Sequence, residues 1–359
     1  SNLDEITKNL TNENIYVKNI AEIIDGEQFS IFKNDSELFS KSVIELEKNW
    51  RETSHAIQSI RDNKAIANSE LSLLDDENFQ GLKSNISFDE NELKHINIKR
   101  TKPKVAILRE QGVNGQNEMA AAFTLAGFNA FDVHMQDLLD GNTNLKDFQG
   151  MAVCGGFSYG DVLGAGGGWS KTILYNNLVK DQFQEFFSDE KVFTLGVCNG
   201  CQMLSNLKDI IPGAEFWPSF ERNLSDQFEA RLAQVKISKT ESVLLDGMED
   251  WMIPVASAHG EGRAQFNNND LQELEKSNQI AMRFVDLSEN SSEIYPINPN
   301  GSPNGITGIT ASNGRVTIMM PHPERVFRKV QLSWHRKDWN EYSPWMQIFI
   351  NAKKFSDKN

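Results

Sequence analysis

The pattern of apolar and polar positions divides the chain near residue 100. Residues 1–100 are largely polar, and their pattern predicts a strand over 29–32 and a helix over 37–62. From Lys104 onward, short apolar runs alternate with helical segments. We expect strands over 105–108, 129–133, 151–154, 192–197 and 315–319, and helices over 117–125, 172–187 and 345–354. After about residue 230 the strands alternate more with polar positions, which indicates antiparallel additions at one edge of the sheet.

Continuous apolar strands separated by helices are typical of a parallel sheet that is covered on both faces. The sequence therefore predicts an α/β fold for residues 101–359, with an open, mostly parallel sheet and helices on both faces. A small α+β appendage is expected over 1–100. A basic segment, 99–104, marks the boundary, because Pro103 forces its predecessor into an extended conformation. The chain starts at Ser1 without an initiator Met, so we expect it to be a piece of a longer polypeptide.

Charge and composition exclude several classes of function. The net charge of −14 argues against nucleic-acid binding, which needs a basic face. No apolar run approaches the roughly 18 residues that cross a bilayer. Three cysteines do not suggest a disulfide framework, and a reducing cytoplasm is expected. No Cys/His pair has the spacing of a zinc site, so no metal is expected.

One cysteine lies in a motif that is typical of a nucleophile. The apolar strand over 192–197 leads into Gly196-Val-Cys198-Asn-Gly200-Cys-Gln202, which opens a helix. A nucleophile on a sharp strand-to-helix turn adopts a strained backbone and needs very small neighbours. The start of the helix favours thiolate over thiol, and the N–H of Asn199 is well placed to bind an oxyanion. Cys154 and Cys201 lack the two flanking glycines and are interpreted as core residues.

The expected base follows a later strand, in Pro321-His322-Pro323-Glu324. The two prolines hold the segment extended, and residues two apart in an extended chain point to the same side. His322 and Glu324 can then face one cleft, with the carboxylate orienting the imidazole.

Two further clusters are candidates for the site. Gly155, Gly156 and Phe157 follow the strand over 151–154, and free N–H groups there could complete an oxyanion hole. His259, Glu261 and Arg263 form a dense polar cluster that could bind substrate or face a partner domain.

These motifs together resemble the class I glutamine amidotransferases, which use a Cys-His-Glu triad. The stretches 104–114, 155–164, 257–263 and 298–305 are most similar to the amidotransferase region of the large single-chain phosphoribosylformylglycinamidine synthases of purine biosynthesis. The resemblance covers essentially all of residues 104–350. The Trp50-Arg-Glu-Thr segment also resembles the end of that family's ATP-using synthetase region, so 1–100 would be its tail plus a linker.

The resemblance implies a flavodoxin-like glutaminase domain over 101–359. Cys198 would form a glutamyl thioester, His322 would transfer protons, Glu324 would orient His322, and Gln202 would help to hold glutamine. The released ammonia would pass to a synthetase domain of the same polypeptide. ATP and magnesium are expected only in that synthetase region, and no cofactor is expected in this part, which would be monomeric.

Three alternatives remain open at the level of the sequence. The chain could be an amidotransferase of another pathway, a cysteine peptidase or deglycase on a similar sheet, or a binding module that has lost activity. Amidotransferases of other pathways are not expected to contain the Trp50-Arg-Glu-Thr segment. Cysteine peptidases and deglycases do not need a glutamate at the position of Glu324.

Overall fold

The computed structural model describes residues 3–76, 81–96, 102–267 and 269–359. The chain divides into two compact units, residues 1–54 and 55–359. The basic segment 99–104 that marks the predicted boundary lies partly outside the described residues, as do Ser1 and Asn2.

The first unit is small and mixed. It contains α1 (Leu3–Asn12) and an antiparallel hairpin of β1 (Gln28–Lys33) and β2 (Ser36–Ser42). Asn34 and Asp35, between the strands, both have left-handed φ angles, which suit a tight hairpin turn. The predicted helix over 37–62 is wrong in its first part, because Ser36–Ser42 pairs with β1, and α2 (Val43–Arg61) starts only afterwards.

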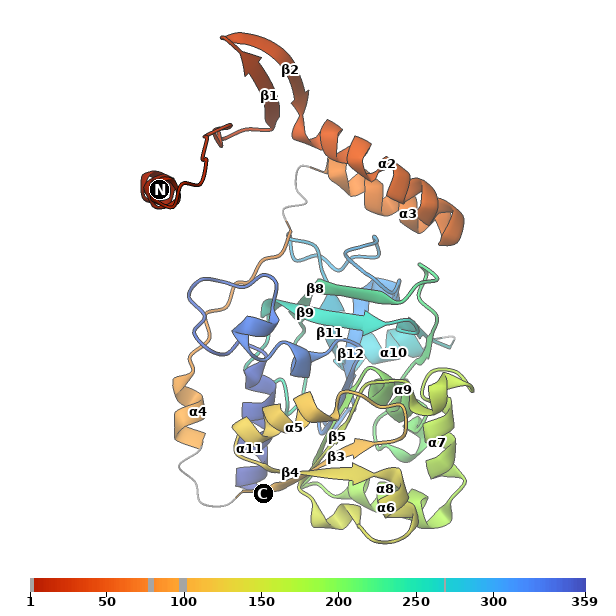
Figure 1. Ribbon diagram of the computed structural model, residues 1–359. Helices are drawn as coiled ribbons and strands as arrows, with labels where there is room; N and C mark the ends of the chain where they lie inside the picture. The colour runs from red at the N-terminus through yellow and green to blue at the C-terminus, as the bar shows by residue number, and fades with distance from the viewer. Residues whose placement is uncertain (1–2, 77–80, 97–101, 268) are drawn as a thin grey trace. The chain divides into compact units, whose positions relative to one another are not determined.

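The second unit is built on a nine-stranded sheet within the described residues, in the order β4-β3-β5-β6-β13-β12-β11-β8-β9 (Figure 1). The first five strands in this order are parallel, and the last four are added antiparallel, as the alternation after residue 230 predicts. Their bounds are β3 Lys104–Arg109, β4 Asn129–His134, β5 Gly150–Val153, β6 Phe193–Val197, β8 Glu229–Ile237, β9 Met252–His259, β11 Ile280–Phe284, β12 Ile306–Thr310 and β13 Val316–Met319. A separate pair is formed by β7 (Ser219–Glu221) and β10 (Arg263–Gln265).

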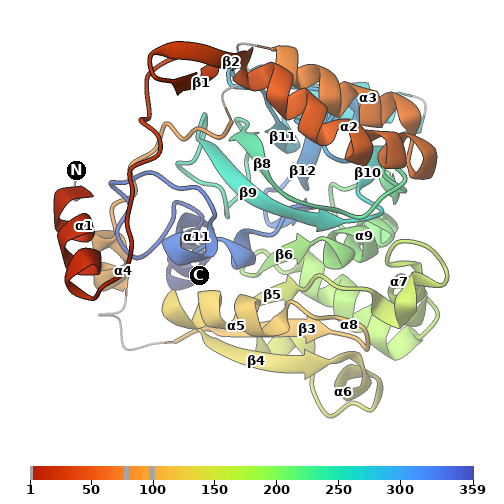
Figure 2. The ribbon, with the colours of Figure 1, turned by 45° about the horizontal axis from the view of Figure 1, so that its top comes forward.

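Helices cover both faces of the parallel strands, so the predicted fold class is confirmed. The chain runs from β3 outward to β4, then reverses to β5 and β6. Because such crossovers are right-handed, α5 and α8 lie on opposite faces (Figures 1 and 2). The helices of this unit are α3 Lys64–Ser72, α4 Asn91–Ile96, α5 Gln116–Leu125, α6 Met135–Leu139, α7 Gly167–Leu174, α8 Asn177–Ser188, α9 Asn199–Ser205, α10 Asp270–Lys276 and α11 Met346–Lys358.

The single helix predicted over 172–187 is instead two helices, α7 and α8. The break has a local cause: the side chain of Asn176 accepts a hydrogen bond from the N–H of Val179 at 3.2 Å and caps α8. The strand and helix boundaries elsewhere in 104–359 agree with the expected ranges to within a few residues.

The core lies between the parallel strands and their helices. β5, β6 and β13 are buried along their whole length. On one face, Phe123 of α5 contacts Phe128, Phe193 and Phe349 at ring-centroid distances of 5.0–5.9 Å. Among the helices that the structure describes, none is long and apolar enough to cross a membrane. The rigid, buried strands fix the positions of the loops at their carboxyl ends.

Candidate active site

Cys198 lies at the turn between the central strand β6 and α9. Its φ and ψ are 51° and −111°, a strained conformation for a residue with a side chain. The turn is held from both sides, because the N–H of Cys198 donates to the carbonyl of Met319 at 2.9 Å and its carbonyl accepts from the N–H of Gln202 at 2.9 Å. The strained backbone that the motif predicts is therefore present at Cys198.

The two glycines that flank Cys198 are required by packing. A Cβ atom at Gly200 would lie 2.1 Å from the carbonyl oxygen of Val153 in β5, which is backbone and cannot yield easily. A Cβ atom at Gly196 would lie 2.5 Å from Leu204 and 3.2 Å from Ile318. The small residues thus let α9 approach the sheet closely enough to hold the turn.

His322 follows β13, the strand beside β6, and pairs with Glu324. The Nδ1 atom of His322 lies 2.6 Å from Oε1 of Glu324, and the two side chains are 1% and 0% exposed. The backbone differs from the expected extended form: Pro323–Arg325 is a single turn of 3₁₀ helix, and the N–H of His322 donates to the carbonyl of Ala256. The pair still forms because the tight turn brings the carboxylate back to the ring.

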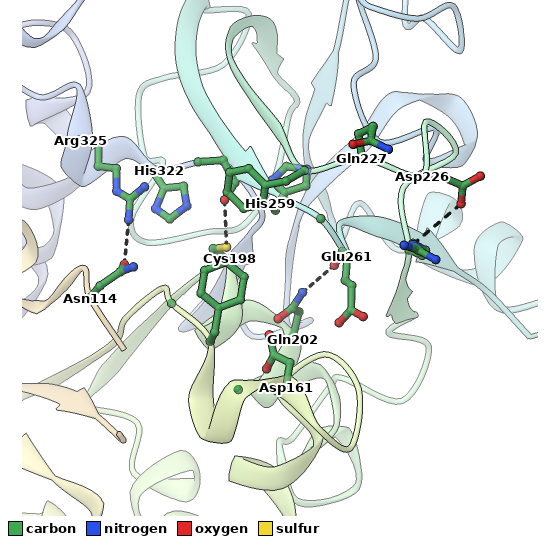
Figure 3. A pocket seen from close by; sticks show the side chains of 17 residues that line it. Asn114, Asp161, Cys198, Gln202, Asp226, Gln227, His259, Glu261, His322 and Arg325 are labelled. Atoms are coloured by element: carbon green, nitrogen blue, oxygen red, sulfur yellow. Dashed lines mark hydrogen bonds and ion pairs between the residues drawn. The ribbon is translucent and has the colours of Figure 1, made fainter. Parts of the chain in front are cut away.

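Cys198 and His322 meet at one wall of a cleft of about 310 Å³ (Figure 3). A Cβ atom built at Gly155 would lie 2.7 Å from Cε1 of His322 and 3.2 Å from Cβ of Cys198, so both side chains reach the same point. Nε2 of His322 is buried and has no hydrogen-bond partner among the described residues. It is free to exchange a proton with a bound molecule.

The other two cysteines are unsuited to nucleophilic chemistry. Cys154 and Cys201 are fully buried. Burial is the main cause that raises the pKa of both thiols well above the ordinary value, and they stay protonated. Neither lines the cleft.

The electrostatics of the pair favour an imidazolium ring. Burial opposes the charged form, but the charges of Glu324 and Cys198 outweigh it and raise the pKa of His322 to about 10. Since this pKa exceeds that of histidine in an unfolded chain, protonation stabilises the fold fully below about pH 6.5. That contribution is lost as the pH rises to about 10.

Glu324→Gln is expected to lower the pKa of His322, because the variant loses the carboxylate charge that offsets burial. The Cε1–H resonance of His322, followed by NMR against pH, should titrate near 10 in the parent chain and at least one unit lower in the variant. Glu221→Gln, which changes a carboxylate outside the cleft, is the control. An unchanged titration in Glu324→Gln would contradict the role of this charge.

Two backbone segments with N–H groups lie near Cys198: a Cβ atom at Gly155, in the loop after β5, would lie 3.2 Å from Cβ of Cys198, and Asn199 is the first residue of α9. No hydrogen bond from the N–H of Gly155, Gly156 or Asn199 is found among the described residues. Gly156 has a φ of 146°, and a Cβ atom there would lie 2.5 Å from Cα of Val113. Phe157 differs from these: its N–H donates to the carbonyl of Gly112 at 2.9 Å, and its ring is half exposed at the rim of the cleft.

Buried amides join three walls of the cleft. Oδ1 of Asn199 accepts the N–H of Ser158 at 3.0 Å, and Nδ2 donates to Asp161 and to Gln202, both at 2.9 Å. Nε2 of Gln202 donates in turn to the carbonyl of Glu261 at 2.6 Å. These bonds fix the loop after β5 and the turn after β9 relative to the nucleophile.

The three residues of the predicted cluster, His259, Glu261 and Arg263, do not all border the cleft. Glu261 lines the cleft. His259 also borders it but is buried, and burial, with a smaller contribution from His322, lowers its pKa to about 3, so it stays neutral. Arg263 does not line the cleft; it pairs with Glu221 at 3.0 Å, because the β10–β7 pairing turns it away.

Several residues of the cleft were not among the site residues predicted from the sequence. Asp161 and Arg222 line it, as do Asn114 and Arg325, which form a 3.0 Å hydrogen bond to each other. Asn114 lies at the loop after β3, where the carboxyl-end rule for parallel strands applies, whereas Arg222 comes from the short β7 region. Among the described residues, no group of three or more His, Cys, Asp or Glu side chains is placed to bind a metal ion.

Comparison with known proteins identifies a family and structures to which this chain is similar. A family model described as the CobB/CobQ-like glutamine amidotransferase domain matches residues 102–356. The fold is similar to that of a chain in the structure of PurLQS from Thermotoga maritima, with a TM-score of 0.53 and 21% identity over 71% of this chain and 99% of that chain. A glutamine amidotransferase from the same organism gives a TM-score of 0.38 and 15% identity over 63% of this chain and 77% of that chain. The family match spans more than half of the chain, which therefore belongs to the CobB/CobQ-like glutamine amidotransferase domain family.

Proposed function

We propose that this chain hydrolyses the side-chain amide of glutamine through a thioester on Cys198 and supplies ammonia to a synthetase. The observation that carries the proposal is the buried His322–Glu324 pair, joined at 2.6 Å, beside the strained Cys198 in one cleft. Burying a charged pair costs desolvation energy, and buried pairs with strongly shifted pKa values occur most often at functional sites.

In the first half of the reaction, the sulfur of Cys198 attacks the amide carbon of glutamine. The carbonyl oxygen takes the negative charge, and the N–H groups of Gly156 and Asn199 would stabilise it; the absence of other hydrogen bonds from them among the described residues supports this role. The C–N bond then breaks while the imidazolium of His322 gives its proton to the departing nitrogen, which leaves as ammonia. A glutamyl thioester remains on the sulfur.

In the second half, His322, now neutral, takes a proton from water, whose oxygen attacks the thioester carbon. The C–S bond breaks, and glutamate and the Cys198 sulfur are released. Glu324 fixes the ring through Nδ1, which leaves Nε2 to act in both halves. One residue thereby serves first as acid and then as base.

The acceptor of the ammonia is proposed to be the synthetase of phosphoribosylformylglycinamidine synthesis, in the purine pathway. The proposal rests on the motifs over 104–114, 155–164, 257–263 and 298–305, which are similar to those of this enzyme family. ATP and magnesium would act in that synthetase region. There is a physical reason for ammonia to pass through the protein to the synthetase site, because ammonia released into neutral water is protonated and no longer nucleophilic.

Labelling with diazo-oxonorleucine, an electrophilic glutamine analogue, tests the proposed function. We expect one adduct per chain, mapped by mass spectrometry to Cys198, and protection by added glutamine. The same chain should release ammonia from glutamine but leave peptides intact. An adduct on Cys154 or Cys201 with Cys198 unmodified, or cleavage of peptides without glutamine hydrolysis, would contradict the proposal.

A further inference from the structure

A buried carboxylate outside the cleft contacts the loop that follows β5. Glu110 directly follows β3, and the loop over 155–161 comes after β5. These two strands are parallel neighbours in the sheet, so their carboxyl ends lie side by side (Figure 1). Glu110 is 4% exposed and does not line the cleft. The proposed chemistry gives this buried charge no role.

The two oxygen atoms of the Glu110 carboxylate have different partners. Oε1 accepts the N–H of Gln111 at 2.8 Å and lies 3.4 Å from Nε2 of His134, the last residue of β4. Nδ1 of His134 accepts the N–H of Gln136 at 3.1 Å, so the ring carries its proton on Nε2, which faces Glu110. Oε2 accepts the hydroxyl group of Tyr159 at 2.7 Å. One oxygen is therefore bound on the side of β3 and β4, and the other reaches across to the loop after β5.

The backbone of that loop is strained at Tyr159. Tyr159, Gly160 and Asp161 have φ angles of 54°, 63° and 51°, so three successive residues are left-handed and two of them carry side chains. Such a backbone persists only when its surroundings hold it in place. The N–H of Tyr159 donates to the carbonyl of Gln111 at 3.0 Å, and its ring packs on α7, where a Cβ atom at Gly168 would lie 2.9 Å from Cδ2. Backbone, ring and hydroxyl group of Tyr159 thus all contact segments outside the loop.

The start of the same loop carries an N–H group that the proposed reaction uses. The carbonyl oxygen of Gly155 accepts the N–H groups of Asn114 and Gly115 at 3.1 and 3.3 Å. The C=O and N–H groups of a trans peptide bond point in opposite directions, so the N–H of Gly156 points away from Asn114 and Gly115. Gly156 lines the cleft. The direction of its N–H group therefore depends on how the loop pairs with the segment after β3.

We propose that Glu110, acting through the hydroxyl group of Tyr159, is a positioning residue for the oxyanion. The segment over 110–115 holds the loop at both ends, at Gly155 and at Tyr159. Only two residues separate Tyr159 from Gly156, so relaxation of the strained end turns the peptide group of Gly156. The proposal rests on the proposed function, because the oxyanion forms only when Cys198 attacks an amide carbon.

Tyr159→Phe tests this role, since it removes the hydroxyl group and keeps the ring against α7. We expect kcat for glutamine to fall about 10-fold, part of the 10²- to 10³-fold loss that follows removal of a whole oxyanion-hole donor. KM should change less than about 2-fold, because the oxyanion exists in the transition state and not in bound glutamine. A merely structural role would lower the unfolding temperature without this split. Tyr175→Phe, at a tyrosine that is 85% exposed, is the matched control and should leave kcat unchanged.

Alkylation by iodoacetamide separates the loop from the nucleophile. The sulfur of Cys198 forms a bond to the methylene carbon while the C–I bond breaks and iodide leaves, so no oxyanion arises. The rate of Cys198 alkylation, followed by mass spectrometry, should agree between Tyr159→Phe and the parent chain to within about 2-fold. Equal losses in alkylation and in glutamine hydrolysis would show damage to Cys198 itself and would overturn the proposal.

Combining Glu110→Gln with Tyr159→Phe tests whether the two side chains act through their shared hydrogen bond. Glu110→Gln alone should lower kcat, because the amide nitrogen must face one of the donors that the carboxylate accepts. The double variant should be no slower than the slower single variant, to within about 2-fold, if the bond is the means of action. Losses that multiply, or an unchanged kcat in Tyr159→Phe, would reject the positioning role. When the parent chain hydrolyses glutamine, these outcomes leave the proposed function standing; a parent chain that does not hydrolyse glutamine rejects both.

Discussion

Replacing Cys198 with alanine is expected to abolish glutamine hydrolysis, lowering kcat by about 10⁶-fold, the scale seen when a nucleophile acting as part of a unit is removed. The loss is large because every later step depends on the thioester, and water alone cannot be activated in the same position. Ammonia release from glutamine, measured at saturating substrate, is the readout. Diazo-oxonorleucine should no longer modify the chain.

Cys201→Ala is the matched control for this variant. Cys201 lies three positions further on, in α9, and is fully buried. Its replacement by alanine removes packing contacts of the core but no group that takes part in the reaction. It should keep kcat within a few-fold while lowering the unfolding temperature slightly. Retention of more than about one per cent of the activity by Cys198→Ala would remove the thioester from the mechanism.

The nucleophile turn could be predicted from sequence because its signature is local. Gly196 and Gly200 flank Cys198 within one short motif, although the contacts that require them also involve the neighbouring strands, at Val153 and Ile318. His322 and Glu324 could be paired because they are two residues apart, although the chain brings them together by a 3₁₀ turn and not by an extended segment. The predicted extended conformation was therefore wrong, but the predicted contact between His322 and Glu324 is present.

The part of the cleft lined by Asp161, Arg222 and Glu261 could not be predicted in the same way. Asp161, Arg222 and Glu261 lie on three separate loops, and no spacing in the sequence relates them. Arg263 shows the opposite case. It lies two residues from Glu261 in the sequence and was predicted to belong to the same cluster, but the β10–β7 pairing directs it to Glu221. Short-range patterns identify the chemistry of a turn, whereas the walls of a cleft depend on how distant loops are brought together by the sheet.

The second large effect is expected for His322→Ala, which should lower kcat for glutamine by about 10²- to 10⁴-fold, as is typical when a general acid–base is removed. The fold should persist, because the ring lies in the cleft and the strand β13 keeps its backbone pairing with β6. His259→Asn provides the contrast within the same cleft. Since His259 is neutral and bonded to Asn300, its loss should reduce stability more than kcat.

A substrate with a better leaving group distinguishes the acid role of His322 from a merely structural one. Ammonia leaves only if its nitrogen is protonated, whereas p-nitrophenolate leaves unaided from a γ-glutamyl p-nitrophenyl ester. If His322 supplies that proton, His322→Ala should slow the acylation burst with the ester at least ten-fold less than it slows glutamine hydrolysis. A variant that lost both activities equally would have lost the geometry of Cys198, and the imidazolium would not be the acid. The buried Nε2 atom, free of any partner among the described residues and next to the sulfur, is the reason to expect the unequal loss.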